Sequence, residues 1–283
     1  MTSSTEKRPP LPYFDMLLEQ LNLGTPAVQE AFGRHVHWGY WENPGQATGT
    51  TDDFAIAAER LCQKVYRTVE VQEGQRLLDA GCGFGGTIAS LNENFQHLNL
   101  TGLNIDPRQL ERARQEVQPL HQNKIQFIEG DACQMPLEAG TMDVVLAVEC
   151  IFHFPSREAF FREARRVLQP GGRLGICDFV PMQILRSLEG FLSQFGSDLV
   201  ARTYGQVDSS TTLAKYQDLA QKTGFKVVTQ TDITANTLPT YPVVRDIFGR
   251  FGLPDSAQST AAIELISRLR LLRYQILSFE RID

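Results

Sequence analysis

The sequence predicts an α/β protein built on a doubly wound, largely parallel sheet. Two observations predict it. Short apolar segments suited to buried strands alternate with segments whose apolar residues recur at helical spacing, as in sheets covered by helices on both faces. The first of these strand-like segments, residues 77–80, also runs directly into a glycine-rich stretch at residues 81–86. A turn of this kind between strand and helix is suited to holding a ligand against bare backbone.

Length and composition fit one soluble α/β domain with appended helices. The chain has 283 residues, of which 42% are hydrophobic and 21% charged, so it can bury a sizeable core. A net charge of −6 without any basic run argues against nucleic acid and anionic membranes as partners. The five cysteines stand singly and residues 1–10 are polar, which favours buried, reduced thiols and a cytoplasmic protein without a signal peptide. No feature indicates an oligomeric state.

The region ahead of the glycine turn is expected to be helical. Helical spacing over residues 13–32 predicts one or two helices, and a further helix is predicted to begin near Thr51. Between them, residues 35–41 are dense in aromatic rings, which most often indicates a packed edge of the core. The two histidines of this stretch have no accompanying ligands, so no metal site is predicted.

Four further strands are predicted in the central part of the chain, each ending near a polar residue. They cover residues 98–105, 125–129, 143–149 and 173–179. After the first of them, Asp106 is expected to cap a helix, because a proline follows it at the first helical position.

The last third of the chain is expected to complete the sheet and to cover it. An insertion between the fifth strand and the next helix lies above the carboxyl ends of the strands, so it is the best candidate for a substrate lid. The predicted elements are the helical insertion at 180–205, a helix from 209 to 224, a strand at 224–233, an apolar loop at 238–242, a helix at 255–271 and a strand at 274–279.

The glycine turn distinguishes between two classes of ligand. Dinucleotide-binding enzymes carry G-x-G-x-x-G after the strand, whereas here the glycines fall as G-x-G-x-G-G with Asp79 two residues before Gly81. An acid at this position repels a pyrophosphate but accepts hydrogen bonds from an amino group. The stretch resembles the D-x-G-x-G-x-G signature of class I S-adenosylmethionine (SAM) dependent methyltransferases, whose cofactor carries an α-amino group and a sulfonium. A nicotinamide-dependent oxidoreductase is the alternative outside this class.

The resemblance implies a seven-stranded sheet with an antiparallel last strand, and a set of cofactor contacts. Asn104 and Gln109 look like the amide pattern of the subgroup that includes cyclopropane synthases, tocopherol methyltransferases and natural-product O-methyltransferases, where amides replace the usual ribose-binding acid. In this family the acid of the Gly-Asp-Ala turn accepts from the adenine amine, and the H-x-G-Y-W element covers the methionine end. The implied residues for SAM, and for its product S-adenosylhomocysteine, are Asp79, Gly81, Gly83, Asn104, Gln109, Asp131, Ala132, Glu149, Trp38 and Tyr40.

The same resemblance implies a division of the chain. Residues 1–70 are expected to form an N-terminal helical cap and 71–180 the SAM-binding core. Residues 181–210 are expected to be the lid insertion, and 211–283 to complete the fold.

A catalytic pair is predicted at two adjacent strand ends. Methyl transfer to a hydroxyl requires loss of a proton, and histidine is the side chain whose pKa suits that task. His153 follows the fourth strand and Asp178 ends the fifth, so the aspartate can orient the imidazole. The surrounding E-x-x-x-H-x-P and D-F-V stretches resemble those of bacterial sugar O-methyltransferases, in which the matching residues form the catalytic pair. The alternative for His153 is a histidine that only packs on the lid.

These observations predict a SAM-dependent methyltransferase of a small, natural-product-like acceptor, with O-methylation slightly favoured. The alternatives are N- or C-methylation of a small amine or of an isoprenoid or quinol, with Glu149 meeting a cationic amine, and a SAM-binding protein without catalytic activity. The acceptor itself is not predicted by these residues.

Overall fold

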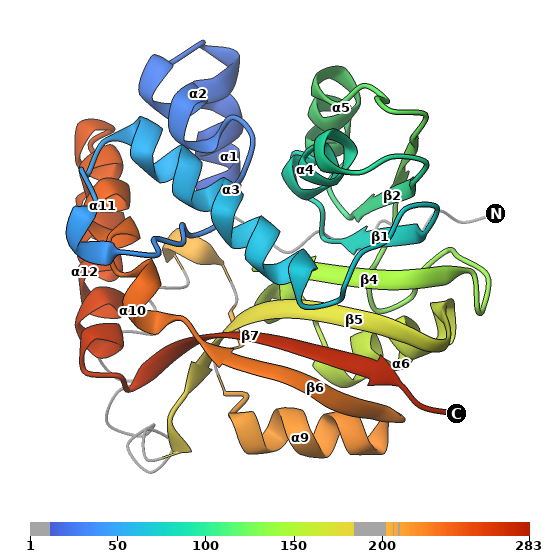
Figure 1. The fold of residues 1–283 in the computed structure, drawn as a ribbon. Coiled ribbons are helices and arrows are strands. Elements are labelled where there is room, and N and C mark those ends of the chain that lie inside the picture. Colours follow the sequence, from blue (N-terminus) through green and yellow to red (C-terminus); the bar gives the residue numbers. More distant parts are fainter. Residues whose placement is uncertain (1–11, 184–201, 206, 209) are drawn as a thin grey trace, which may run out of the picture.

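The computed structural model describes residues 12–183, 202–205, 207, 208 and 210–283, and its centre is one seven-stranded sheet (Figure 1). The order is β3-β2-β1-β4-β5-β7-β6, and β7 is antiparallel to both neighbours, as predicted. The strands are β1 (Arg76–Ala80), β2 (Asn99–Asn104), β3 (Lys124–Glu129), β4 (Met142–Val148), β5 (Leu168–Pro181), β6 (Phe225–Asp232) and β7 (Leu272–Arg281).

Helices cover both faces of the sheet because successive apolar residues of the central strands point to opposite sides. Leu77 and Val144 join one core with helices α3 (Thr51–Arg67) and α4 (Gly86–Asn94). Their neighbours Leu78 and Val145 join a second core on the other face. That core is covered by α6 (Arg157–Val167) and α9 (Leu213–Lys222), while α5 (Pro107–Glu116) packs beside β2 and β3.

A third core joins the first two helices of the described chain to α11 in a helical cap (Figure 1). Phe14 of α1 (Pro12–Asn22) and Phe32 of α2 (Pro26–Phe32) share it with Phe248 of α11 (Thr240–Arg250). The remaining elements are α12 (Pro254–Arg268), α10 (Thr234–Thr237) and the short 3₁₀ turns η1 (Pro44–Gln46) and η2 (Ile151–His153). The sequence predicts one or two helices at the start of the chain, and the structure has two.

Helix boundaries agree with the sequence where a cap was recognised and differ elsewhere. Asp106 caps α5 as predicted, with its side chain accepting from Arg108 N. The expected loop at 238–242 is wrong, since α11 begins at Thr240 and Pro242 lies in the first turn, where a missing N–H costs nothing. The helix expected from residue 209 begins instead at Leu213. Most of the expected lid, residues 184–201, lies outside the described residues.

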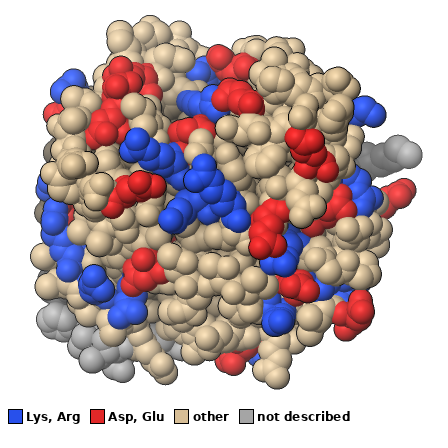
Figure 2. All heavy atoms as spheres, in the orientation of Figure 1, with Lys and Arg blue, Asp and Glu red and all other residues tan. Residues whose placement is uncertain are grey.

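Two surface properties bear on the expected partners. None of the helices within the described part of the chain combines the length and apolar character needed to span a bilayer. Acidic and basic side chains are interspersed over the face in Figure 2, where the basic groups near the centre are bordered by acidic ones.

Candidate functional site

The strand register gathers the predicted polar residues at the carboxyl edge of the sheet. Asp79 of β1 lies beside Gly102 of β2 and Leu146 of β4. Val148, the last residue of β4, pairs with Cys177, so the residues that follow them, Glu149 and Asp178, occupy the same edge. Neighbouring parallel strands end together, and α/β folds bind ligands at this edge.

Asp79 is a buried carboxylate that has no counterion among the described residues. It is 2% exposed, and its Oδ1 has no hydrogen-bond partner among the described residues. Burial raises its pKa to about 7, and the Thr87 hydroxyl opposes that shift. A buried acid in this state binds a cationic donor favourably because the donor supplies the missing charge and the missing hydrogen bond.

The glycine turn is closed on one side and open on the other. Gly81, Gly83 and Gly85 all have positive φ angles, of 81°, 53° and 82°. A Cβ on residue 81 would lie 2.8 Å from Cys150 Sγ, whereas one on residue 83 would meet nothing closer than Gln109 Oε1 at 3.9 Å. The turn leads straight into α4 at Gly86, which exposes the first backbone N–H groups of that helix.

The two amides predicted from the sequence are brought together beside this turn. Asn104 Nδ2 donates to Gln109 Oε1 at 2.7 Å, and Asn104 Oδ1 accepts from Ile105 N at 2.9 Å. Both side chains are buried. Because one buried amide fixes the other, the pair presents a preformed set of donors and acceptors.

The turn after β3 holds the next two predicted residues. Asp131 Oδ1 accepts from Cys133 N at 2.7 Å, so this oxygen shapes the turn. Ala132 is buried in the same core as Met135. The expected contacts of Asp131 and Ala132 with an adenine ring stay predictions.

Glu149 joins the aromatic segment to the end of β4. Its Oε2 accepts from Trp38 N at 3.0 Å and from the Tyr274 hydroxyl. Burial raises the pKa of Glu149 to about 8, which the hydrogen bonds from Tyr274 and Trp38 oppose. The Trp38 ring packs edge-on against Phe179 at 5.8 Å between centroids. The segment that contains Trp38 is therefore held over the strand ends.

Tyr40 packs against helix α3. Its backbone N donates to Ala57 O at 2.8 Å, and Lys64 Nζ lies 4.9 Å from the centre of its ring. Both partners belong to α3, so the ring packs against that helix. Its expected contact with the cofactor stays a prediction.

The nearby histidines belong to a hydrogen-bond chain behind the site. His37 Nδ1 lies 2.9 Å from Trp38 O, and His35 Nε2 lies 2.8 Å from Glu59 Oε2. Potential ligand atoms of His35, Glu59 and Cys62 lie within 4.8 Å of one another. Arg34 Nε already approaches the same Glu59 oxygen at 3.1 Å and compensates its charge. The absence of a metal stays a prediction.

His153 meets a residue that the sequence did not indicate. The hydroxyl of Tyr13, on the first helix, lies 3.2 Å from His153 Nε2. Burial, followed by the charge of Glu149, raises the pKa of Tyr13 well above its usual value, so the phenol stays protonated. Tyr13 lies 140 positions from His153 in the sequence, and no local spacing pattern could have paired them.

Asp178 is held by a buried network that was also missed. Its Oδ2 accepts from Arg157 Nη2 at 2.8 Å and from the Tyr216 hydroxyl, and its Oδ1 accepts from Phe179 N at 2.8 Å. Burial raises the pKa of Asp178, although the Arg157 charge opposes the shift. Arg157 also pairs with Asp208. An effect of Asp178 on His153 stays a prediction.

Comparison with known proteins identifies the family of this chain. Residues 78–176 match the family described as a methyltransferase domain. The chain is 32% identical to Methyltransferase GfsG of Streptomyces halstedii over 223 residues, which are 78% of this chain and 76% of that protein. The chain belongs to the SAM-dependent methyltransferases. SAM is therefore the methyl donor of this enzyme, and the nicotinamide alternative is wrong.

Two further comparisons describe the methyltransferase. It is 32% identical to an O-methyltransferase of Pyrenophora dematioidea over 218 residues, 76% of this chain and 77% of that protein. It superposes on geranyl diphosphate methyltransferase in complex with SAM with a TM-score of 0.69 at 17% identity, covering 88% of this chain and 99% of that chain. The second likeness concerns the fold alone.

The residues at the carboxyl edge fit this donor. The uncompensated Asp79 suits the α-amino group, and the open side of the turn at Gly83 suits a ligand held close to the backbone. The amide pair Asn104 and Gln109 suits neutral hydroxyl groups.

Proposed function

We propose that the enzyme methylates a hydroxyl group of a small natural product, with His153 as the general base. The observation that carries the proposal is the Tyr13 hydroxyl, which lies within hydrogen-bonding distance of His153 Nε2. This contact supports the proposal because it places a hydroxyl group where an acceptor hydroxyl would have to lie to form a hydrogen bond with the imidazole. Support also comes from the O-methyltransferase among the relatives.

Each cofactor contact is proposed for a residue at the carboxyl edge. Asp79 would hold the amino group of SAM, Asn104 and Gln109 the ribose hydroxyls, and Asp131 the adenine amine. The glycine turn would support the methionine portion, and Glu149 would act through Trp38 by holding that segment in place.

SAM when bound supplies an electrophilic methyl group and a neutral leaving group. The chain must then align an acceptor with that methyl group and exclude water. Aromatic side chains gather around His153: the ring of Phe152 lies 4.4 Å from its ring and that of Tyr13 6.0 Å, between centroids. We propose that the acceptor hydroxyl replaces the Tyr13 hydroxyl at Nε2 and gives up its proton there.

Labelled SAM and a panel of hydroxylated metabolites, with mass spectrometry of the products, test this proposal. His153→Ala is expected to lower kcat by about 10²- to 10³-fold while the affinity for SAM stays unchanged, because a general base acts only on the acceptor. A hydroxyl acceptor whose turnover survives the substitution would remove His153 from the role of base.

N-methylation is the second candidate, and Glu149 is the observation that favours it. This buried carboxylate has a raised pKa and no ion-pair partner within the described part of the chain, so an ammonium group could supply its counterion. In the same panel, a methylated amine, with turnover lost in Glu149→Gln but kept in His153→Ala, would favour N-methylation.

We also infer that the enzyme acts in the cytoplasm. All five cysteines are free thiols, although Cys133 is only half-buried rather than buried as expected.

A further inference from the structure

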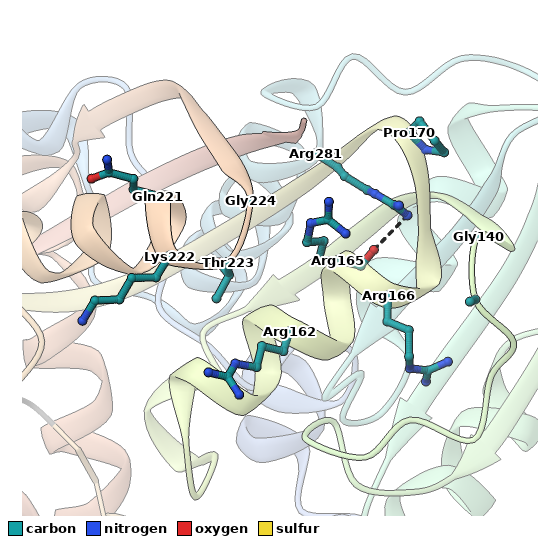
Figure 3. A pocket seen from close by; sticks show the side chains of 11 residues that line it. Gly140, Arg162, Arg165, Arg166, Pro170, Gln221, Lys222, Thr223, Gly224 and Arg281 are labelled. Carbon is teal, nitrogen blue, oxygen red and sulfur yellow. Dashed lines mark hydrogen bonds between the residues drawn. The ribbon is translucent and has the colours of Figure 1, made fainter. Parts of the chain in front are cut away.

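A basic cavity lies at the edge of the sheet opposite to the candidate active site. It has a volume of about 760 Å³ and is formed where α6 and α9 end and where β5 and β6 begin (Figure 3). These are the amino ends of the parallel strands, whereas Asp79 and Glu149 lie at the carboxyl ends. The cavity is therefore separate from the methyl-transfer site.

The lining of this cavity is positively charged in a protein with a net charge of −6. Five of its 11 lining residues are arginine or lysine, and none is acidic. Arg162 and Arg166 have carboxylate partners on their own helix. Arg165, Lys222 and Arg281 have no carboxylate partner anywhere in the described residues, so three positive charges lack an acidic side chain to pair with.

Two of these arginines are fixed in place. Gly224 has a φ of 74°, which favours glycine, and a Cβ there would lie 2.4 Å from Arg165 Nε, so this guanidinium packs directly against the glycine. Arg165 Nη2 donates to Ile282 O at 3.2 Å. Arg281 donates to the carbonyl of Arg165 at 3.0 Å (Figure 3). It also donates to the carbonyl of Leu168. Its Nε is buried without a hydrogen-bond partner in the part of the chain described.

Helix ends explain part of this arrangement. The carboxyl ends of α6 and α9 are negative and attract cations, and Arg281 caps the end of α6 directly. The attraction of cations to helix ends explains why Arg281 lies here. It does not explain why a pocket is present or why the Arg165 guanidinium packs against Gly224 beside it. The two guanidinium groups face one space without a carboxylate partner among the described residues, and an anion bound between them would relieve their mutual repulsion.

We propose that this cavity binds a small, multiply charged phosphate compound. Guanidinium groups bind phosphate oxygens through charge-assisted hydrogen bonds, and Arg165 Nη1 and Arg281 Nη2 are the donors that the carbonyl contacts leave for an anion. The pocket is shallow and open to solvent, so a soluble phosphate ester can reach it, and its volume exceeds that of a single phosphate group.

Calorimetry with sodium pyrophosphate on the full chain tests this proposal, with sodium chloride at equal ionic strength as the reference. We expect saturable binding that weakens by about tenfold in Arg165→Gln and in Lys222→Gln. Arg60→Gln removes an exposed charge of α3 and serves as the control, which should bind like the wild type. The affinity for SAM, measured in the same samples, should be equal in all four proteins.

Two results would overturn the proposal. If pyrophosphate binds no better than chloride, the cations only neutralise the ends of α6 and α9. If Arg60→Gln weakens binding as much as Arg165→Gln does, the attraction is a general charge effect and not a site.

Discussion

Replacing Asp79 by asparagine should separate stability from cofactor binding. The pKa of this carboxyl is raised from 3.8 to about 7 by burial. An acid whose pKa is raised on folding stabilises the protein least when it is ionised: stability falls as pH rises from about 4 to about 7. At about 1.4 kcal/mol for each pH unit, the loss at pH 8 reaches at most about 4 kcal/mol. Asparagine cannot ionise, so a protein with asparagine at this position does not lose this stability as pH rises.

The ligand-free Asp79→Asn protein should therefore be more stable than the wild type at pH 8, by about 2 to 4 kcal/mol, and similar to it at pH 4. Urea unfolding at the two pH values measures this difference. Binding of SAM should weaken at least about 100-fold, because the variant lacks the charge that pairs with the amino group. In the wild type, affinity for SAM should rise with pH up to about 7, since the carboxyl must lose its proton.

A matched control lies on the neighbouring strand. Asp143 accepts from Arg76, and this hydrogen bond lowers its pKa. Asp143→Asn should therefore lose stability at neutral pH and keep its affinity for SAM. The reasoning about Asp79 is refuted if Asp79→Asn is destabilised at pH 8, or if it binds SAM as tightly as the wild type does.

Three further predictions concern other parts of the fold. Gly81→Ala should destabilise the protein more than Gly74→Ala in urea unfolding. Both glycines have positive φ, but only a Cβ on residue 81 would lie as close as 2.8 Å to Cys150. Equal losses of unfolding free energy in the two variants would contradict this reasoning. Arg157→Met should lower the free energy of unfolding by about 3 to 5 kcal/mol, because it leaves the buried Asp178 without an ion-pair partner. A loss below about 1 kcal/mol in thermal unfolding would contradict a stabilising role for the Arg157–Asp178 pair. Asn104→Ala should weaken SAM binding by about tenfold in calorimetry, and the melting temperature of the ligand-free protein should change by no more than a few degrees. An unchanged affinity for SAM would exclude Asn104 from the site.

Much of the fold could be predicted because the signals are local. The alternation of Leu77 and Leu78 between two cores is the pattern of a strand buried on both faces, and it repeats in β4. The contact between Asn104 and Gln109 follows from a strand end and the first turn of the next helix. Asp79 could be singled out because an acid next to a glycine turn has few structural uses.

The missed features depend on contacts between distant segments. Tyr13 reaches His153 from a helix that looked only apolar in sequence, and Arg157 meets Tyr216 across 59 positions. Their residue types are common on helices, so nothing in the sequence separated them from surface positions. The expected loop at 238–242 was wrong for a different reason: a segment with two prolines can begin a helix, because Pro242 is compatible with the first turn.

A crystal structure of the enzyme with S-adenosylhomocysteine would test the central claim most directly. The account predicts the α-amino group within about 3 Å of Asp79 Oδ1, with the ribose hydroxyls at Asn104 and Gln109. A product molecule bound away from the Gly81–Gly85 turn, with Asp79 still lacking a partner, would contradict it.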